Sequence, residues 1–305
     1  MKVAVTGATG VIGTSAVRAL VAAGHDVVGL ARTPSKAADL ESRGAQAALT
    51  SIFDQDGLAR MFDGCDAVCN FATHIPVGYS AAWPGAWREN DRLRTEGVRR
   101  VVDAARQAGV RRLVQESVSF IYADNGDDWI TERSPVEINR ATEPASVGES
   151  HVQDYACRSR QGVVLRFGTI VGDDGLTRWL LRSARHGRPV GMGRPESWAH
   201  VVHTDDLGPA VVAALNAPGG VYNVGAEPVR RADLVQGYAD AVGQDSGEFI
   251  GPLLRKLAGT RVEPLTRSLR VNSEHFVAQT GWTPRRATFD ASWFDVVDRE
   301  SKAVR

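Results

Sequence analysis

The first part of the chain alternates short apolar runs with segments whose apolar residues recur every three or four positions. Residues 2–5 are apolar after Lys2 and stop at Thr6-Gly7, which is typical of a strand buried on both faces. In residues 11–23 the apolar positions have helical spacing, and Gly24 follows where helices commonly end. The pattern therefore predicts a strand, a glycine turn and a helix.

The same alternation continues as far as residue 167. Apolar runs predict further strands at 27–31, 47–49, 67–71, 113–114 and 163–167. Helical spacing predicts helices near 34–43, 56–62, 87–108 and 148–160. Strands that alternate with helices in this way form a parallel sheet with helices on both faces. We therefore expect an α/β protein with a doubly wound parallel sheet of the Rossmann type.

After Gly168 the alternation breaks down, because Gly- and Pro-rich stretches at 172–175, 187–195 and 218–220 separate shorter segments. We expect residues 1–170 to form the larger domain and residues 171–305 a smaller C-terminal lobe. Residues 201–203 (VVH) and 221–224 (VYNV) contain valines, and we expect them to return to the main sheet. The two parts would then interleave near residues 200–225.

The turn after the first strand, TGATGVIG, contains glycines at intervals of three. Gly7 permits a tight turn, Gly10 lets backbone N–H groups approach a pyrophosphate, and Gly13 lets the helix pack on the strand. The helix N-terminus adds about half a positive charge. The motif predicts a dinucleotide site in the 1–170 domain. Its expected contacts are Gly7, Thr9, Gly10, Val11, Ile12 and Gly13.

The spacing GxxGxxG resembles that of the short-chain dehydrogenase/reductase superfamily, in its extended or atypical branch of epimerase- and dehydratase-like proteins. Segments 65–72, 165–168, 203–206 and 281–284 (CDAVCNFA, LRFG, HTDD and GWTP) are similar to motifs of that branch. Asn90 matches a family asparagine that precedes a long helix. The resemblance covers nearly the whole chain. It implies an NAD(P)-dependent enzyme acting on a hydroxyl or carbonyl of a small metabolite, with the C-terminal lobe binding the substrate.

The end of the second strand predicts which cofactor is bound. An acidic residue there would take the ribose 2′-hydroxyl of NAD, but Ala31 and Arg32 occupy the place and residues 27–38 contain no carboxylate. Arg32, helped by Lys36, would instead pair with a 2′-phosphate. We therefore expect NADP(H) in preference to NAD(H).

The resemblance also implies neighbours for the two ends of the cofactor. The family contacts adenine through an Asp-hydrophobic pair, and here Ser51-Ile52 takes its place without the Asp. The residues expected between the pyrophosphate and the nicotinamide are Phe71, Ala72 and Thr73.

The proton-transferring pair of this superfamily is missing from the chain. Members use Tyr-x3-Lys, in which the Lys cation lowers the pKa of the Tyr hydroxyl so that it exchanges a proton with the substrate. None of the four lysines follows a tyrosine by four residues. If Glu149 is the acidic residue that follows this pair in the family, Ala141 and Ala145 stand where the Tyr and the Lys would be.

Three other side chains are candidates for catalysis. Ser117, in QESVSFIY, matches the substrate-contacting serine of the family, and Ser119 is expected beside the substrate. His74 follows the fourth strand, and histidine titrates near neutral pH, so it could act as acid or base. Tyr122 is an alternative proton donor.

Further substrate contacts are expected in loops at the carboxyl edge of the sheet. Tyr79 and Trp83 in the loop 76–85, and Trp198 at the end of the segment 191–198, would wall an apolar pocket. Arg267, in RSLR, resembles the arginine with which sugar-nucleotide members of the family hold a diphosphate.

Composition excludes several other classes of protein. In 305 residues, 36 Lys plus Arg balance 36 Asp plus Glu, so no net charge attracts nucleic acid or an anionic membrane. No apolar run reaches the ~18 residues that span a bilayer. Cys65, Cys69 and Cys157 lack CxxC spacing, which argues against a zinc site or a disulfide framework and favours a reducing cytoplasm. The resemblance adds the expectation of a homodimer.

The sequence thus predicts an NADP-dependent oxidoreductase or epimerase/dehydratase-like enzyme with a non-standard proton donor. Two alternatives stay open because the Tyr-x3-Lys pair is missing. One is a non-redox isomerase or cyclase on the same scaffold. The other is a redox-silent protein that binds NADP(H) and reports its redox ratio to a partner.

Overall fold

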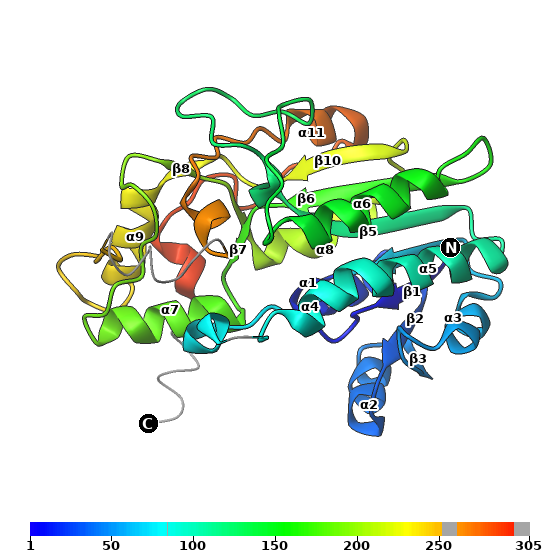
Figure 1. Ribbon diagram of the computed structural model, residues 1–305. Helices are drawn as coiled ribbons and strands as arrows, with labels where there is room; N and C mark the ends of the chain where they lie inside the picture. Colours follow the sequence, from blue (N-terminus) through cyan, green and yellow to red (C-terminus); the bar gives the residue numbers. More distant parts are fainter. Residues whose placement is uncertain (84, 252–260, 296–305) are drawn as a thin grey trace.

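The computed structural model describes residues 1–83, 85–251 and 261–295. Its centre is a seven-stranded sheet in the order β10-β6-β5-β4-β1-β2-β3, in which every pairing is parallel (Figure 1). The predicted doubly wound α/β fold is confirmed. The strands are β1 (Lys2–Thr6), β2 (Asp26–Ala31), β3 (Gln46–Leu49), β4 (Ala67–Asn70), β5 (Arg112–Val118), β6 (Gln161–Phe167) and β10 (Gly220–Val224).

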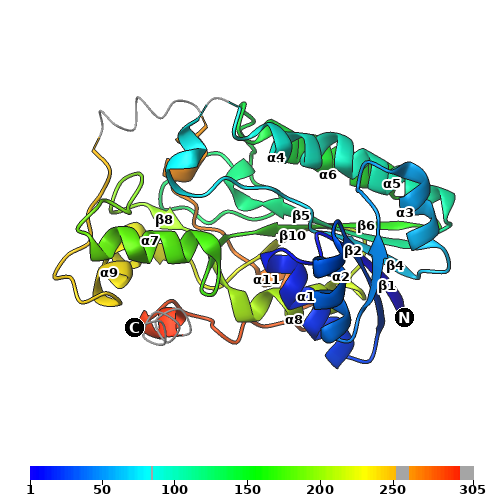
Figure 2. The same ribbon diagram turned by 90° about the horizontal axis from the view of Figure 1, so that it is seen from below.

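Helices cover both faces of this sheet (Figure 2). Successive side chains of a strand point to opposite faces, so Val3 and Val5 of β1 pack in one apolar core and Ala4 packs in the other. The first core is covered by α1 (Val11–Ala22), α2 (Pro34–Ser42), α8 (Thr204–Ala214) and α11 (Glu274–Thr280). The second is covered by α3 (Gln55–Phe62), α5 (Val98–Gln107) and α6 (Glu143–Tyr155).

The predicted long helix 87–108 is present with a change of winding in its first half. It consists of α4 (Arg88–Arg92), a π-helical turn η2 (Leu93–Gly97) and α5, joined without a break. Such π-turns occur frequently at functional sites. Here the turn contains Arg94, whose side chain is buried.

The register of the parallel strands brings their carboxyl ends to one edge. Thr6 of β1 lies beside Asn70 of β4, and Phe167 of β6 lies between Val118 of β5 and Val224 of β10. The residues that follow these strands therefore line the same edge of the sheet. In open α/β sheets, ligands bind outside this edge.

Beyond β6 the chain builds a smaller lobe with its own apolar core, at the left in Figure 1. Two short sheets belong to it, one of β7 (Thr169–Val171) with β9 (Val201–His203) and one of β8 (Trp198–Ala199) with β11 (Val229–Arg230). Its helical segments are α7 (Gly175–Arg185), α9 (Arg231–Asp240), η4 (Glu263–Thr266) and η5 (Ala291–Phe294).

One of the two segments expected to rejoin the main sheet does so. Residues 221–224 lie in β10, but residues 201–203 pair with β7 instead. The backbone of His200 packs on Gly168, where a Cβ atom would lie 2.7 Å from the His200 carbonyl carbon. The chain therefore turns out of the main sheet at Gly168 and pairs with β9 there.

Two further boundaries differ from the sequence prediction. The strand expected at 113–114 extends to Val118, because Gln115, Glu116 and Ser117 are buried and hydrogen-bonded although they are polar. The helix expected at 148–160 is α6, which begins five residues earlier with a proline in its first turn, where proline is tolerated. Ser117 therefore lies inside a strand and not after it.

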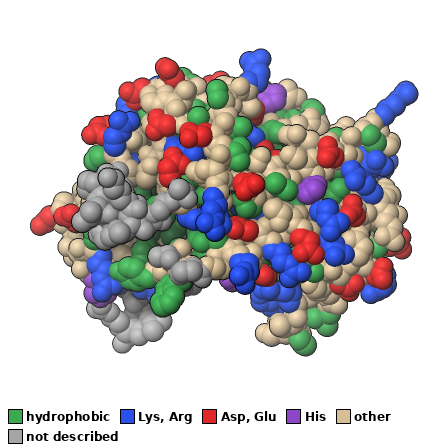
Figure 3. Space-filling model, in the orientation of Figure 1, with side chains coloured by type: hydrophobic (Ala, Val, Ile, Leu, Met, Phe, Trp, Pro, Cys, Tyr) green, Lys and Arg blue, Asp and Glu red, His purple; other side chains and the backbone are tan. Residues whose placement is uncertain are grey.

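Basic and acidic side chains are interspersed on the face shown in Figure 3, in keeping with the balanced charge of the chain. Within the described ranges, no helix is both long enough and apolar enough to cross a membrane.

Candidate functional site

The glycine loop between β1 and α1 lies against the backbone that follows β4. Gly7 has a φ of 65°, and a Cβ atom on it would lie 2.4 Å from the carbonyl carbon of Phe71. A Cβ atom on Gly13 would lie 2.1 Å from the carbonyl oxygen of Gly7. Packing therefore requires glycine at both positions. Gly10 has more room, because its nearest neighbour would be the Gly7 carbonyl oxygen at 3.3 Å.

The N-terminus of α1 is open to solvent at this loop. Gly10 is the capping residue, so no side chain accepts from the first N–H groups, and the first turn contains no acidic residue. Gly10 and Val11 are exposed and Thr9 is half-buried, whereas the Ile12 side chain packs in the core. Free N–H groups and the positive end of the helix dipole thus face outward together. These residues fit the pyrophosphate of a dinucleotide, which needs close backbone approach and positive potential.

The end of β2 presents a free cation next to this loop. Ala31 is buried, while Arg32 is exposed and forms no ion pair with any residue in the described ranges. Lys36 is half-buried in the first turn of α2, where its backbone N–H donates to the Thr33 hydroxyl. The guanidinium of Arg32 is therefore available to an external anion.

The two residues expected at the adenine have different surroundings. Ser51 is half-buried, and its hydroxyl oxygen accepts from the backbone N–H of Phe53 at 3.2 Å. Ile52 is 6% exposed and packs in the core, where a Cβ atom on Gly97 would lie 3.3 Å from its Cδ1. The side chain of Ile52 is thus part of the packing between the sheet and the helix layer.

Buried asparagines hold the segment that follows β4. The backbone N–H of Ala72 donates to the side-chain oxygen of Asn70, and that of His74 donates to the side-chain oxygen of Asn90 at 3.2 Å. Phe71 is buried in the core, Ala72 and Thr73 are half-buried, and the ring of His74 is exposed. The structure thus brings Phe71 and Ala72 to the glycine loop and leaves His74 at the surface.

A buried ion pair controls the hydroxyl of Ser117. The Ser117 Oγ donates to Glu149 at 2.5 Å, and Arg166 donates to both oxygens of the same carboxylate, from Nε at 2.9 Å and from Nη2 at 2.6 Å. Burial by itself lowers the pKa of Arg166. The hydrogen bonds to Glu149 and the negative charge of that carboxylate have the larger effect, so the pKa of Arg166 is raised. The proton of Ser117 is therefore committed to a carboxylate inside the protein.

Tyr122 is fully buried and donates its hydroxyl hydrogen to the Asn223 side-chain oxygen at 2.7 Å. The Arg166 guanidinium lies 4.8 Å from the centre of its ring. Burial raises the pKa of Tyr122 although Arg166 opposes the shift. Tyr122 is thus a neutral phenol whose proton is shared with a neighbouring side chain.

By sequence, Ala141 and Ala145 are matched, through Glu149, to the positions of the family's Tyr and Lys. Ala145 is buried in the first turns of α6, and the backbone N–H of Ala141 donates to the Asn139 side-chain oxygen at 2.8 Å. Ser119 begins the turn after β5 and is fully buried, and its hydroxyl has no hydrogen-bond partner among the residues the structure describes.

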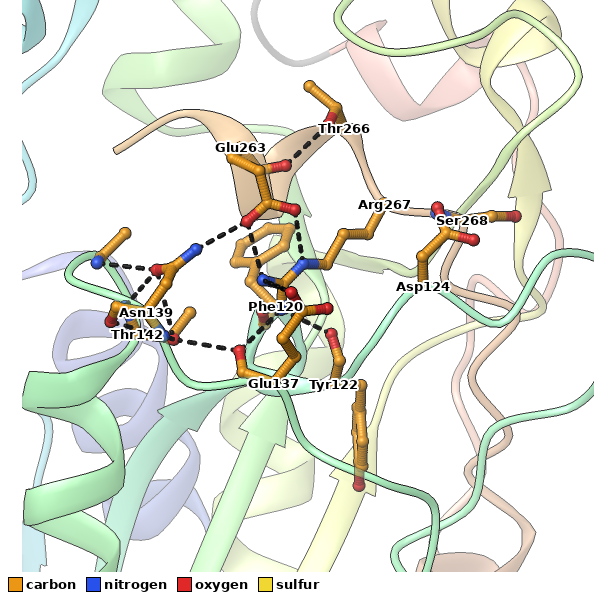
Figure 4. A network of polar contacts seen from close by, with 11 residues as sticks. Phe120, Tyr122, Asp124, Glu137, Asn139, Thr142, Glu263, Thr266, Arg267 and Ser268 are labelled. Atoms are coloured by element: carbon orange, nitrogen blue, oxygen red, sulfur yellow. Dashed lines mark hydrogen bonds and ion pairs between the residues drawn. The ribbon is translucent and has the colours of Figure 1, made fainter. Parts of the chain in front are cut away.

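Arg267 is enclosed by protein acceptors (Figure 4). It is 1% exposed, and its Nε and Nη2 donate to the Glu263 carboxylate at 2.9 and 2.7 Å. Its Nη1 donates to the backbone carbonyls of Tyr122 and Glu137 at 2.8 and 2.9 Å. Glu263 also accepts from the Asn139 amide at 2.6 Å. This arginine joins η4 to the segment after β5, so its donors are not presented to a diphosphate in this structure.

The three predicted wall residues belong to two different surfaces. Tyr79 and Trp83 are 65% and 72% exposed, and the Tyr79 ring meets Trp179 of α7 edge-on with centroids 5.6 Å apart. Trp198 is half-buried, and the guanidinium groups of Arg230 and Arg270 lie 3.9 and 4.7 Å from its ring centre. Trp198 therefore packs within the smaller lobe.

Comparison with known families identifies the scaffold. The model of the NAD dependent epimerase/dehydratase family matches residues 3–225. The chain belongs to this family. The resemblance to extended short-chain dehydrogenases is thereby confirmed, and the protein is an NAD(P)-dependent enzyme of that group.

A 3-diazoavenalumate denitrifying reductase from a Streptomyces species is 30% identical over 318 residues, covering 98% of this chain and 100% of the relative. The human epimerase family protein SDR39U1 (isoform 2) with NADPH has a TM-score of 0.81 at 22% identity, covering 98% of this chain and 99% of that one. MoeE5 in complex with UDP-glucose and NAD has a TM-score of 0.78 at 21% identity, covering all of both chains. The two structures share the fold.

Sequence reasoning missed the partners that fix these side chains. Glu149 accepts from both Ser117 and Arg166. Glu263 accepts from Arg267, four residues away, and from Asn139, 124 residues away in the chain. The available signal is that Glu149 and Arg166 are charged residues within a predicted helix and a predicted strand of the sheet.

Proposed function

We propose that this protein is an NADP(H)-dependent reductase of a small aromatic acid, and that its hydride acceptor is a diazo group. The supporting observation is that Ser117 and Tyr122 donate their protons to protein acceptors. In addition, no lysine of the chain follows a tyrosine by four residues. An acceptor that needs a hydride but no proton suits such a site. The relative that spans nearly the whole chain is named for this kind of reduction.

The preference for NADP(H) is supported by charge at the end of β2. Arg32 is exposed without an acidic partner among the described residues, and residues 27–38 contain no carboxylate that would repel a 2′-phosphate. Lys36 lies four residues further along and adds positive charge. Gly10, Thr9 and Val11 would hold the pyrophosphate at the N-terminus of α1.

The reaction balances without an enzymic acid. When bound, the nicotinamide would supply the hydride. In an aryldiazonium substrate whose ring hydroxyl is protonated, the aryl C–N bond is replaced by a C–H bond while N₂ leaves, so this step takes up no proton. Reduction of a carbonyl, in contrast, creates an alkoxide that must be protonated. In this chain, Ser117 can offer only lone pairs, because its hydrogen points to Glu149. It would thus accept a hydrogen bond from a substrate hydroxyl and orient the ring.

Isotope transfer tests this proposal directly. The protein is mixed with 3-diazo-4-hydroxycinnamate and NADPH that is deuterated at either the pro-R or the pro-S position of C4. We expect deuterium from one of the two positions to appear on the ring carbon that lost nitrogen, with one N₂ released for each NADPH oxidised. The 4-hydroxycinnamate product is analysed by mass spectrometry and NMR.

Protein-free and Gly13→Val samples control for spontaneous reduction, because diazonium ions react with reductants in solution. The proposal is overturned if nitrogen loss is no faster with the protein than without it. It is equally overturned if the new ring hydrogen comes from D₂O, since that result requires a proton donor.

A further inference from the structure

Arg231, the first residue of α9, is a cation of the smaller lobe that forms no ion pair with the residues the structure describes. Its Nη2 donates to the carbonyl oxygen of Arg267 at 2.7 Å, while its Nε is enclosed and has no hydrogen-bond partner among the described residues. Burial lowers its pKa to about 10, against the effect of Asp124. The Asp124 oxygens themselves accept from the backbone N–H groups of Gly126 and Ser268.

A second donor without a partner lies next to Arg231 in the fold. Ser197 is 3% exposed, and its hydroxyl makes no hydrogen bond with the described part of the chain. Its carbonyl oxygen accepts from the backbone N–H of Arg231 at 2.8 Å, so the two residues are in contact. Enclosed donors without acceptors are costly and uncommon in folded proteins. These two donors belong to residues that are joined by a backbone hydrogen bond, and an external acceptor bound there would pair with them.

Glycine keeps space open beside the free Nε. Gly193 has a φ of 85°, and a Cβ atom on it would lie 3.3 Å from the Arg231 Nε and 2.9 Å from the carbonyl oxygen of Thr266. Any other residue would strain the backbone there and press on the guanidinium. Gly193 and Ser197 both belong to the segment 191–198, which is expected from the sequence to contribute to the wall of the substrate pocket.

The position of Arg231 also connects it to the candidate active site. The Arg267 carbonyl that it contacts belongs to the residue whose guanidinium holds the backbone of Tyr122 and Glu137 (Figure 4). Tyr122 follows β5, the strand that contains Ser117. Arg267 thus links Arg231 to the segment that contains Tyr122, at the carboxyl edge of the sheet.

We propose that Arg231, assisted by the Ser197 hydroxyl, binds the carboxylate of the substrate. This inference rests on the proposed function for the nature of the substrate, an aromatic acid. A guanidinium presents two parallel N–H donors that match the two oxygens of a carboxylate. The acid group would supply the acceptor that the Nε and the Ser197 hydroxyl lack. It would also fix the far end of the substrate in the smaller lobe, away from the reacting carbon.

Binding of an unreactive acid and its amide tests this role without any turnover. Calorimetric titrations use 4-hydroxycinnamate and 4-hydroxycinnamamide, with protein saturated with NADP⁺. We expect Arg231→Gln to weaken acid binding by about 10- to 150-fold, the value of a hydrogen bond to a charged group, and to leave amide binding unchanged. Ser197→Ala should weaken acid binding by about 2- to 13-fold.

Arg230→Gln is the matched control, because it removes the same charge from the adjacent residue, which packs on Trp198. It should leave both affinities unchanged. Thermal unfolding checks that each variant is folded. If Arg231→Gln is not folded, Arg231→Lys replaces it in the titrations. The lysine keeps the charge but loses the paired donors, so it too should weaken acid binding.

Equal losses for acid and amide, the same loss in Arg230→Gln, or wild-type protein that does not distinguish acid from amide would overturn the inference. Failure of the two proposals can be told apart. If Arg231 controls acid binding but diazo acids are not reduced, only the proposed function fails. If diazo acids are reduced with an unchanged KM in Arg231→Gln, only the carboxylate site fails.

Discussion

The two halves of the sheet's carboxyl edge differ in whether their charged groups are paired within the protein. Beyond β1 and β2, the helix N-terminus at Gly10 and the guanidinium of Arg32 face solvent with no acidic partner among the described residues. At β5 and β6, two ion pairs are enclosed between a strand and the helix that covers it: Arg94 with Glu116 at 2.6 Å and Arg166 with Glu149 at the same distance. All four of these side chains are at most 8% exposed.

This contrast suits the first half to binding the cofactor and the second half to positioning the substrate. In the first half, the N-terminus of α1 and Arg32 create a positive potential that attracts an external anion such as a cofactor phosphate. The second half has neutralised its own charges, and the hydroxyl protons of Ser117 and Tyr122 are donated to protein acceptors. A site of this kind can position a hydride acceptor but has little capacity to deliver a proton.

The largest effect is expected from breaking the enclosed pair. Glu149→Ala leaves the Arg166 charge buried without an acid, and it leaves the Ser117 hydroxyl without its acceptor. Removing one partner of a buried pair costs about 3–5 kcal/mol in the free energy of unfolding. Urea denaturation with NADPH absent measures this loss, provided that the m-value is unchanged.

The double variant Glu149→Leu/Arg166→Met is the control, because it removes both charges and keeps apolar volume. It should recover most of the lost stability, since replacing a whole buried pair is often neutral. A loss below about 1 kcal/mol in Glu149→Ala would contradict the description of this half as enclosed, because exposed pairs contribute no more than that.

The two halves also differ in how far their sequence predicts them. The glycine turn was predictable because Gly7, Gly10 and Gly13 act within one strand-turn-helix unit. The surroundings of Ser117 were not, because Glu149 is 32 residues away. Arg267 binds carbonyls 145 and 130 residues earlier in the chain. Local patterns contain no information on such long-range pairs.

The same physics explains the errors in the predicted elements. Strand β5 was predicted too short because buried polar residues interrupt its apolar run, and their partners lie on other elements. Residues 201–203 have the composition of a strand of the main sheet. Their pairing with β7 depends on the packing of His200 on Gly168, which no periodicity reveals.

The open half is tested next, by Arg32→Ala. Loss of one charge-assisted contact to the 2′-phosphate should weaken NADPH binding by about 10- to 150-fold and leave NADH binding unchanged. Fluorescence titration of both cofactors at two salt concentrations measures this, and the wild-type preference should shrink at high salt. Lys36→Ala is the companion variant, with a smaller loss. Equal losses for NADPH and NADH would contradict the assignment.

A smaller and less selective effect is expected at the glycine loop. Gly10→Ala places a methyl group on the exposed side of the loop, 3.3 Å from the Gly7 carbonyl oxygen. The fold should tolerate it, while NADPH and NADH both bind about tenfold more weakly, a difference of ~1.4 kcal/mol.

Gly13→Ala sharpens that comparison, because its methyl group would meet the Gly7 carbonyl oxygen at 2.1 Å. It should lower the melting temperature of the cofactor-free protein, since overpacking costs about 1–3 kcal/mol. If Gly10→Ala lowers the melting temperature as much as Gly13→Ala does, the loop is not open at Gly10.

The smallest effect on turnover is expected from Tyr122→Phe. This change removes the hydroxyl that donates a hydrogen bond to the side-chain oxygen of Asn223. Leaving the buried side-chain oxygen of Asn223 without this donor should lower the free energy of unfolding by about 1–3 kcal/mol. The rate of hydride transfer should stay within about twofold of the wild type between pH 6 and 9, because the phenol proton is committed inside the protein. Single-turnover kinetics with deuterated NADPH measure that step by itself. A hundredfold slower rate in a folded variant would make Tyr122 the proton donor, and the charge-neutral half of the edge would then take part in the chemistry.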